Sequence, residues 1–333
     1  MTHPAANEQG RALAAGARSG DRRALGRLLT EIEGRSTAAR AALGELYPLA
    51  GGAHLVGITG PPGAGKSTLV TSLVAAARAQ DRTVAVLAID PSSPITGGAI
   101  LGDRIRMQQH AADDGVFIRS MATRGHAGGL AVATVDAASV LDACGFGLVL
   151  IETVGTGQGE VDVASLADTT VVVQAPEMGD EVQALKAGLL EVADIVAVTK
   201  ADRPGADQAA ASLRAMLTVG AHHDRAAGDR PRPRRPEVLL VSAIAGTGVV
   251  ELLAAIDRRA PSTDDAASDR GHAARLRAEA QLVGLVMERV RDRLASPAAR
   301  AHLAEAVRAV AAHEADPYTA ADGLLATFVD DAP

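Results

Sequence analysis

The stretch Gly60-Pro-Pro-Gly-Ala-Gly-Lys66-Ser67 decides the fold of this 333-residue chain. It follows the apolar run HLVGIT at 54–59 and precedes a segment that predicts a helix starting near Ser67. The stretch matches the pattern G-x-x-x-x-G-K-[ST], in which backbone N–H groups turn toward phosphates and the following helix presents its positive end to them. We therefore predict a phosphate-binding loop, called the P-loop below, with the nucleotide-binding residues Gly60, Pro61, Pro62, Gly63, Ala64, Gly65, Lys66, Ser67 and Thr68. Lys66 is expected to bridge the β- and γ-phosphates, and Ser67 to give its hydroxyl oxygen to Mg²⁺.

Five more apolar runs follow the P-loop, each separated from the next by enough chain for a helix. They are TVAVLAI at 83–89, GLVLIE at 147–152, TVVVQ at 170–174, DIVAVT at 194–199 and EVLLVS at 237–242. Runs that are apolar at successive positions, without alternation, are typical of strands covered on both faces, and such strands form parallel sheets. The predicted fold is an α/β P-loop NTPase with a mostly parallel central sheet.

Helical patterns flank this region on both sides. Residues 1–52 are expected to form an N-terminal helical segment, 53–260 the nucleotide-binding domain, and 269–333 a C-terminal helical arm. In the arm, one side of a long helix is marked by Leu276, Val283, Val286, Val290 and Leu294, and Ser296-Pro297 predicts the start of a second helix. Two helices cannot bury such a stripe alone, so the arm is expected to fold on the central domain or on a second subunit.

The composition excludes several classes of protein. Aromatic residues make up 2% of the chain and the formal net charge is −7, so nucleic acid is a poor partner. The single cysteine, Cys144, cannot close an intrachain disulfide, which favours a reducing compartment. No run reaches the roughly 18 apolar residues of a membrane span, and the N-terminus lacks the apolar run of a signal peptide. We expect a cytoplasmic protein with no membrane contact.

Two acidic residues end predicted strands where a magnesium ligand is needed. Asp90 follows the run at 83–89, and Glu152 ends the run at 147–152. A carboxylate at the end of a neighbouring strand holds the metal in P-loop proteins. In Glu152-Thr-Val-Gly155 the spacing also places a backbone N–H, that of Gly155, where it can contact the γ-phosphate.

The base of the nucleotide is predicted from two loops that follow later strands. Thr199-Lys200-Ala-Asp202 comes directly after one strand, and Ser242-Ala243 after the next. A carboxylate at Asp202 accepts hydrogen bonds from N1 and N2 of guanine and finds no matching donors on adenine, so GTP is expected to bind better than ATP. Asn is usual at the first position of this motif. Thr199 keeps a hydroxyl group but loses the amide, which predicts somewhat weaker base binding without loss of selectivity.

Four segments together carry a more specific resemblance. They are Asp90-Pro-Ser-Ser-Pro, Gly102-Asp-Arg-Ile-Arg-Met107, FIRSMATRGHAGGL at 117–130 and ETVGTGQ at 152–158. With these segments the chain closely resembles the MeaB/ArgK family of GTPases, which act as chaperones of adenosylcobalamin-dependent acyl-CoA mutases such as methylmalonyl-CoA mutase. The likeness covers nearly the whole chain, as far as Asp316-Pro-Tyr-Thr-Ala-Ala-Asp322.

The resemblance implies a homodimeric GTPase that protects the mutase and gates its cofactor loading, with the C-terminal helices as the dimerisation arm. GTP and GDP would be substrate and product with Mg²⁺, and adenosylcobalamin would be met only through the partner enzyme. Asp90, Asp103 and Glu152 would be magnesium-shell carboxylates, and Arg106 a mobile arginine that joins Lys66 and Glu152 in catalysis. Gln183 and Lys186 would lie on the switch loop that communicates with the mutase.

Slow hydrolysis by the chain alone is also expected. Thr156 follows Gly155, so no glutamine stands where small GTPases position the attacking water. An unassisted GTPase turns over at roughly 10⁻³ to 10⁻⁴ s⁻¹, and a partner would accelerate it.

Two other functions share the same P-loop chemistry. The first is a P-loop kinase or ATPase linked to arginine or ornithine transport, against which the guanine motif argues. The second is a GTPase of the nickel-insertion type. Proteins of that type carry metal sites rich in histidine or cysteine, whereas the nine histidines here are scattered and His222-His223 is the only adjacent pair.

Overall fold

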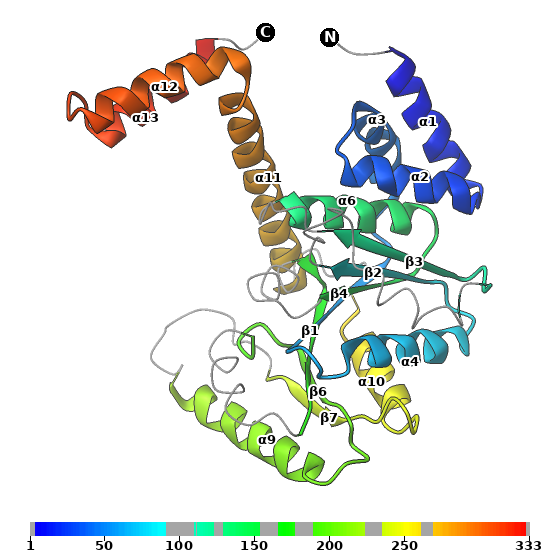
Figure 1. The fold of residues 1–333 in the computed structure, drawn as a ribbon. Helices are drawn as coiled ribbons and strands as arrows, with labels where there is room; N and C mark the ends of the chain where they lie inside the picture. Colours follow the sequence, from blue (N-terminus) through cyan, green and yellow to red (C-terminus); the bar gives the residue numbers. More distant parts are fainter. Residues whose placement is uncertain are drawn as a thin grey trace. The chain divides into compact units, whose positions relative to one another are not determined.

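The computed structural model describes residues 4–90, 110, 112–122, 129–153, 166–176, 189–223, 235–260 and 269–330. Within these residues lies a seven-stranded sheet with the order β3-β2-β4-β1-β5-β6-β7, in which all neighbouring strands are parallel (Figure 1). The strands are β1 (His54–Thr59), β2 (Val84–Asp90), β3 (Val116–Ala122), β4 (Leu148–Thr153), β5 (Thr169–Gln174), β6 (Ile195–Val198) and β7 (Glu237–Leu240). The predicted α/β P-loop fold with its parallel sheet is confirmed.

Helices cover both faces of the sheet, as the strand composition predicts. On one face, α4 (Lys66–Arg78) and α10 (Val249–Asp257) share a buried core with Val84 and Val86 of β2. On the other face, α6 (Gly129–Ala143) shares a second core with Ala85 and Leu87 of the same strand. Helix α9 (Ala206–His223) covers β5, β6 and β7. Because successive residues of a strand point to opposite faces, a strand buried on both must be apolar throughout.

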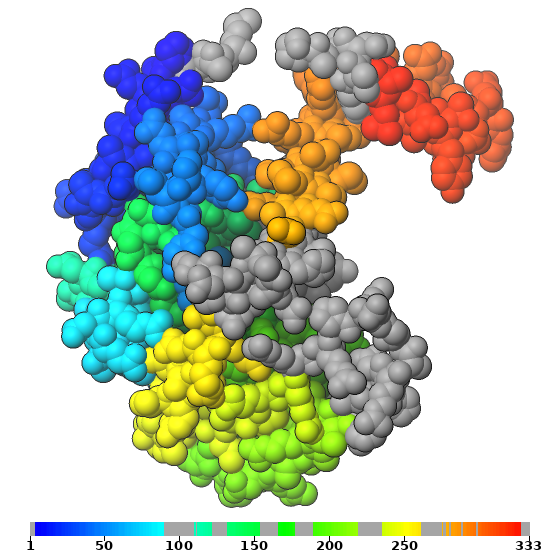
Figure 2. Space-filling view, turned by 180° about the vertical axis from the view of Figure 1, so that it is seen from behind, coloured from blue at the N-terminus to red at the C-terminus, as the bar shows by residue number. Residues whose placement is uncertain are grey.

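The N-terminal helices extend the core on the α6 face. They are α1 (Pro4–Arg18), α2 (Arg22–Glu33) and α3 (Thr37–Leu46), followed by the short η1 (Tyr47–Leu49). Asp21 caps α2 and Ser36 caps α3 through side-chain bonds to backbone N–H groups. Gly10 lets α1 approach α3, because a Cβ there would lie 2.1 Å from the carbonyl oxygen of Ala38. The space-filling view shows these helices, in blue, directly against the green α6 region (Figure 2).

Strand β3 is a strand that the pattern of apolar runs did not predict. It lies at the edge of the sheet, where Arg119 is only part-buried and pairs with Glu33 of α2 and with the Thr30 hydroxyl. An edge strand has one open side and tolerates polar residues, so its sequence lacks the continuous apolar signal of the inner strands.

The chain divides into two compact units, Met1–Arg277 and Ala278–Pro333. Helix α11 (Asp269–Leu294) begins in the first and continues in the second, which also holds α12 (Pro297–Ala311) and α13 (Pro317–Asp330). Ser296 caps α12 and Pro297 is its first residue, as expected. We expected two helices in the arm, and the structure has a third, α13. It follows Asp316, whose carboxylate accepts hydrogen bonds from the backbone N–H groups of Tyr318 and Thr319. The three-part division at 1–52, 53–260 and 269–333 stays a prediction.

The described residues contain no helix that is both long enough and apolar enough to span a membrane.

Candidate nucleotide-binding site

The P-loop connects the end of β1 to the start of α4. Gly60, Gly63 and Gly65 have φ values of +142°, +75° and +92°, which residues other than glycine rarely adopt. A Cβ at Gly60 would also lie 2.2 Å from the carbonyl oxygen of Val173 in β5. The glycines of the pattern are therefore required by the backbone path itself. Helix α4 starts from Gly65 without a side-chain cap, as an anion-binding helix N-terminus does.

The Lys66 side chain lies within the loop it belongs to. Its ammonium group donates hydrogen bonds to the carbonyl oxygens of Gly60 at 2.6 Å and Pro61 at 2.9 Å, and the side chain is buried. A buried ammonium group at the centre of a loop of this shape is suited to meet phosphate oxygens.

Ser67 and Glu152 come together as the sequence predicts. The Ser67 hydroxyl donates to the Glu152 Oε1 atom at 2.6 Å. Glu152 is 1% exposed and stands near the end of β4, between Ile58 of β1 and Ala88 of β2. A hydroxyl oxygen beside a buried carboxylate is a pair of hard oxygen ligands, the type that Mg²⁺ prefers. These residues therefore fit a magnesium ion.

The remaining predicted phosphate and metal residues are described only in part. Asp90 is the last residue of β2, one position beyond the residue that pairs with Thr153 of β4, so its backbone lies at the same edge of the sheet as Glu152. Its side chain lies outside the described part of the structure. The others lie outside the described residues altogether: Asp103, Arg106, Gly155, Gln183 and Lys186.

Thr199 joins the end of β6 to the P-loop. Its hydroxyl oxygen lies 2.5 Å from the carbonyl oxygen of Ala64 and 3.1 Å from that of Gln174, the last residue of β5. The side chain is buried at 3% exposure. The residue that begins the predicted base motif therefore contacts the phosphate loop, a contact between distant parts of the chain that the sequence did not reveal.

Asp202 is held by the second predicted loop. The buried Ser242 donates its hydroxyl to the Asp202 Oδ1 atom at 2.5 Å and accepts from the Ala245 N–H at 3.2 Å. The Ser242 hydrogen bond lowers the pKa of the Asp202 carboxyl, with a smaller contribution from its own backbone N–H. The Asp202 side chain is exposed in the structure, so its desolvation would occur only when a base covers it.

Helix α4 is also tied to the base loops. The Ser72 hydroxyl oxygen, in the second turn of the helix, lies 3.1 Å from the carbonyl oxygen of Ala243 and 3.1 Å from that of Thr68 in the same helix. The Ala201 N–H donates to the Val241 carbonyl oxygen at 3.2 Å, which links the 199–202 loop to the start of the 242–247 loop. Three loops, which follow β1, β6 and β7, are thus held together at the carboxyl ends of these strands. Ser72 was missed because a serine inside a helix carries no signal of its own.

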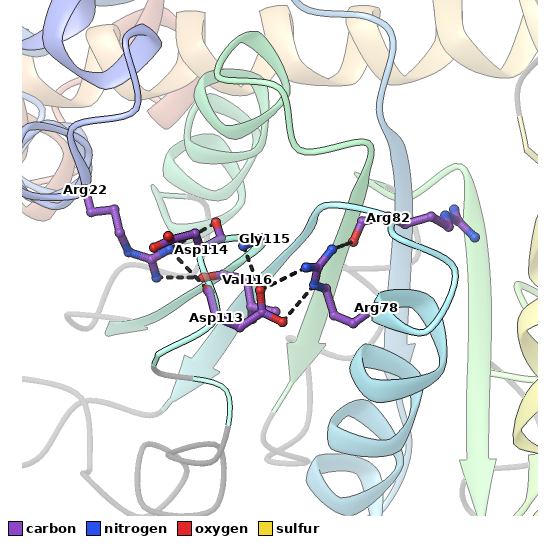
Figure 3. Close-up of polar contacts among 7 residues, drawn as sticks. All are labelled: Arg22, Arg78, Arg82, Asp113, Asp114, Gly115 and Val116. Carbon is purple, nitrogen blue, oxygen red and sulfur yellow. Dashed lines mark hydrogen bonds and ion pairs between the residues drawn. The ribbon is translucent and has the colours of Figure 1, made fainter.

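Charged contacts fix the other end of α4 to the start of β3 (Figure 3). Arg78 donates to both carboxylate oxygens of Asp113, at 2.8 and 3.0 Å, and this contact lowers the pKa of Asp113. Arg22 of α2 donates to the carbonyl oxygen of Val116 at 2.6 Å and lies 5.6 Å from the ring centre of Phe117. The N-terminal helices are thereby attached to the domain that holds the P-loop.

The chain is similar to known proteins along most of its length. A solved structure titled LAO/AO transport system kinase covers 99% of this chain and 99% of its own, with a TM-score of 0.65 and 24% identity, which shows the same fold. The protein named "Putative GTPase" from Pyrococcus abyssi is 45% identical over 312 residues, which is 94% of each chain. The GTPase ArgK of Escherichia coli is 37% identical over 243 residues, or 72% of each chain. The family model described as methylmalonyl-CoA mutase-associated GTPase MeaB matches residues 25–299, and the chain therefore belongs to this family of P-loop GTPases.

Proposed function

We propose that this GTPase serves an adenosylcobalamin-dependent acyl-CoA mutase of the methylmalonyl-CoA mutase type, by protecting it and gating the loading of its cofactor. The observation that carries the proposal is the match to the mutase-associated family over residues 25–299. The fold and the arrangement of the P-loop beside Glu152 supply the nucleotide chemistry that such a role requires.

GTP binding is assigned to the three loops at the edge of the sheet. The P-loop residues 60–68, with the predicted contact of Gly155, would hold the phosphates. Thr199, Lys200, Asp202, Ser242 and Ala243 would surround the base. The Ser242 hydroxyl already orients the Asp202 carboxylate, and one hydroxyl bond leaves other lone pairs of that carboxylate to accept from guanine N1 and N2.

Magnesium would be held by Ser67 and Glu152, with Asp90 and Asp103 as further carboxylates of the metal shell. When bound, the ion neutralises charge that develops on the phosphate oxygens. The short contact between the Ser67 hydroxyl and Glu152 supports this assignment, because it places the Ser67 oxygen beside a buried carboxylate.

Hydrolysis would be slow until a partner completes the site. Lys66 would stabilise the phosphates and Glu152 would hold the metal, while Arg106 would approach the phosphates from its own segment. Gln183 and Lys186 would transmit the nucleotide state to the mutase, which alone would contact adenosylcobalamin.

The C-terminal arm offers a surface for a second copy of the chain. Helix α11 exposes four apolar side chains at i, i+1, i+4 and i+5, with exposures of 56% to 63%: Leu282, Val283, Val286 and Met287. This spacing places them on one side of the helix, as at a helix–helix interface. We assign this stripe to a homodimer.

The test is the GTP hydrolysis rate of the purified chain with and without a purified adenosylcobalamin-dependent mutase from the same organism. We expect the rate to rise about tenfold or more when the mutase is added, since partner residues accelerate P-loop GTPases by large factors. A Lys66→Ala variant should show no hydrolysis under either condition. A rate unchanged by every such mutase, together with transfer of phosphate to an amino acid or a transport protein, would contradict the proposal and favour the kinase.

A further inference from the structure

The geometry points to a base site in which residue 199 gives no hydrogen bond to the guanine N7 atom. We propose that Thr199 is a positioning residue, committed to the P-loop, and that this chain therefore binds 7-deazaguanine nucleotides as tightly as guanine nucleotides. The inference rests on the proposed guanine site at 199–202 and 242–243 and deepens it by stating which edge of the base is read.

The two edges of guanine require opposite partners. N1 and N2 carry hydrogens and need an acceptor, whereas N7 and O6 are acceptors and need a donor. Asp202 can serve the first edge. Thr199 is the residue of the motif next to the P-loop, and it could read N7 only with an N–H or O–H group.

Thr199 has a single side-chain hydrogen to donate. Both atoms near its hydroxyl are carbonyl oxygens, which only accept: that of Ala64 at 2.5 Å and that of Gln174 at 3.1 Å. The Gln174 oxygen already accepts the backbone N–H of Thr199 at 2.8 Å. The shorter contact assigns the hydroxyl hydrogen to Ala64.

A switch of this hydrogen to N7 is unfavourable. Thr199 is 3% exposed and Ala64 is fully buried. If the hydroxyl donated to N7 instead, the buried Ala64 carbonyl oxygen would lose its hydrogen bond from Thr199. Removing the partner of a buried polar group costs more than a typical net hydrogen bond contributes. The contact also fixes the P-loop next to Gly65, whose backbone adopts a left-handed conformation and where a Cβ would lie 3.7 Å from the Thr199 hydroxyl oxygen. The hydroxyl is therefore held in place on the phosphate side.

Asp202 behaves differently although it belongs to the same motif. Its carboxylate is exposed, and Ser242 occupies one lone pair of a group that offers about four. Recognition of N1 and N2 is thus preserved where recognition of N7 is lost. The site should discriminate strongly against adenine while it tolerates a change at N7.

An asparagine at position 199 would change this result. Its carboxamide carries two N–H hydrogens and an acceptor oxygen, so one hydrogen can bind the Ala64 carbonyl while the other reaches N7. Thr199→Asn should therefore create a preference for N7 that the natural chain lacks. Thr199→Val removes the hydroxyl with little change of shape and should weaken all guanine nucleotides by one common factor.

The experiment is a calorimetric titration of the full chain with GDP, 7-deaza-GDP and IDP in the presence of Mg²⁺. For the natural chain we expect dissociation constants for GDP and 7-deaza-GDP within about twofold of each other. IDP lacks the N2 amino group read by Asp202 and should bind about tenfold or more weakly, in line with loss of a hydrogen bond to a charged group. In Thr199→Asn, 7-deaza-GDP should bind roughly five- to tenfold more weakly than GDP.

The possible results distinguish failure of the N7 inference from failure of the proposed guanine site. A natural chain that loses tenfold or more on 7-deaza-GDP while it still discriminates against IDP would overturn the N7 inference and leave the guanine site standing. Equal binding of GDP and 7-deaza-GDP by Thr199→Asn would show that residue 199 does not face N7 and would also overturn it. Failure of the natural chain to bind GDP would overturn both. If Thr199→Asn does not fold, the ratio for the natural chain and the common factor in Thr199→Val still decide the inference.

Discussion

At the scale of single residues, three hydroxyl groups of the proposed nucleotide site each make a short contact with a distant part of the chain. Ser67 reaches Glu152 at 2.6 Å, Ser242 reaches Asp202 at 2.5 Å, and Thr199 reaches the Ala64 carbonyl at 2.5 Å. Each contact joins segments that are distant in the sequence. In each case a hydroxyl group fixes a carboxylate or a loop at the edge of the sheet.

Glu152→Gln should lower the rate of GTP hydrolysis much more than it lowers the affinity for GDP. The amide oxygen can still accept from the Ser67 hydroxyl, so the contact within the fold survives, but the charge that attracts Mg²⁺ is lost. We expect hydrolysis to fall about 100-fold or more, the scale seen when a group that stabilises transition-state charge is removed. Single-turnover hydrolysis and GDP titration measure the two effects. Normal turnover in Glu152→Gln would show that the metal is held elsewhere.

Asp202→Asn should change the base preference from guanine toward xanthine. An amide presents a donor at the position where xanthine carries an oxygen in place of the N2 amino group, so the pairing is restored with the other base. Competition between GDP and XDP for binding measures the change. Asp207→Asn, at an exposed position in the first turn of α9, is the matched control and should keep the natural preference. Retained guanine preference in Asp202→Asn would refute the assignment of the base site.

At the scale of elements, helix α6, which packs against α2 and α3, carries a partly buried carboxyl group, that of Asp136. Burial raises the pKa of Asp136 to about 6, against a weaker opposing effect of Arg35, which follows α2. The folded state therefore binds a proton that the unfolded chain, with an aspartate pKa of about 3.9, releases at lower pH. Stability from this group is full below about pH 4 and is lost as the pH rises through about 6.

Asp136→Asn should remove this pH dependence. Because asparagine resembles the protonated acid, the variant should be more stable than the natural chain at pH 7, by on the order of 2 kcal/mol. The two should approach equal stability near pH 4. Urea unfolding at pH 4, 5, 6 and 7 measures the difference, and a difference that is constant over this range would contradict the assignment.

Helices and strands could be predicted where the residues that specify them lie close together in the sequence. Asp21 and Ser36 mark helix starts because a cap acts within one turn, and the inner strands are recognisable because burial on both faces demands apolar residues throughout. Strand β3 was missed because Arg119 interrupts its apolar run, whereas the other edge strand, β7, has an unbroken run and was predicted. The P-loop and Glu152 could be paired from motif and strand order, whereas the contact of Thr199 with Ala64 depends on how two loops meet in space.

At the scale of the whole molecule, the proposed function needs a GTPase unit and an arm that binds a second copy of the chain. The exposed stripe of apolar side chains on α11 supports the proposed homodimer. Val286→Glu, which places a charge in the middle of this stripe, should shift the chain from dimer to monomer in sedimentation velocity, because burying an unpaired charge at an interface is unfavourable. Val250→Glu changes a valine of similar exposure on α10 and should leave the dimer intact. A Val286→Glu chain that stays dimeric would place the interface elsewhere.

We propose that the carboxyl ends of the strands around the P-loop, Glu152 and Asp202 form a magnesium-dependent site for guanine nucleotides. The most direct measurement is the ratio of the dissociation constants of GDP and ADP for the natural chain with Mg²⁺. We predict that GDP binds at least about 100-fold more tightly, because adenine leaves the Asp202 carboxylate without donors. Comparable affinities for the two nucleotides would contradict the account.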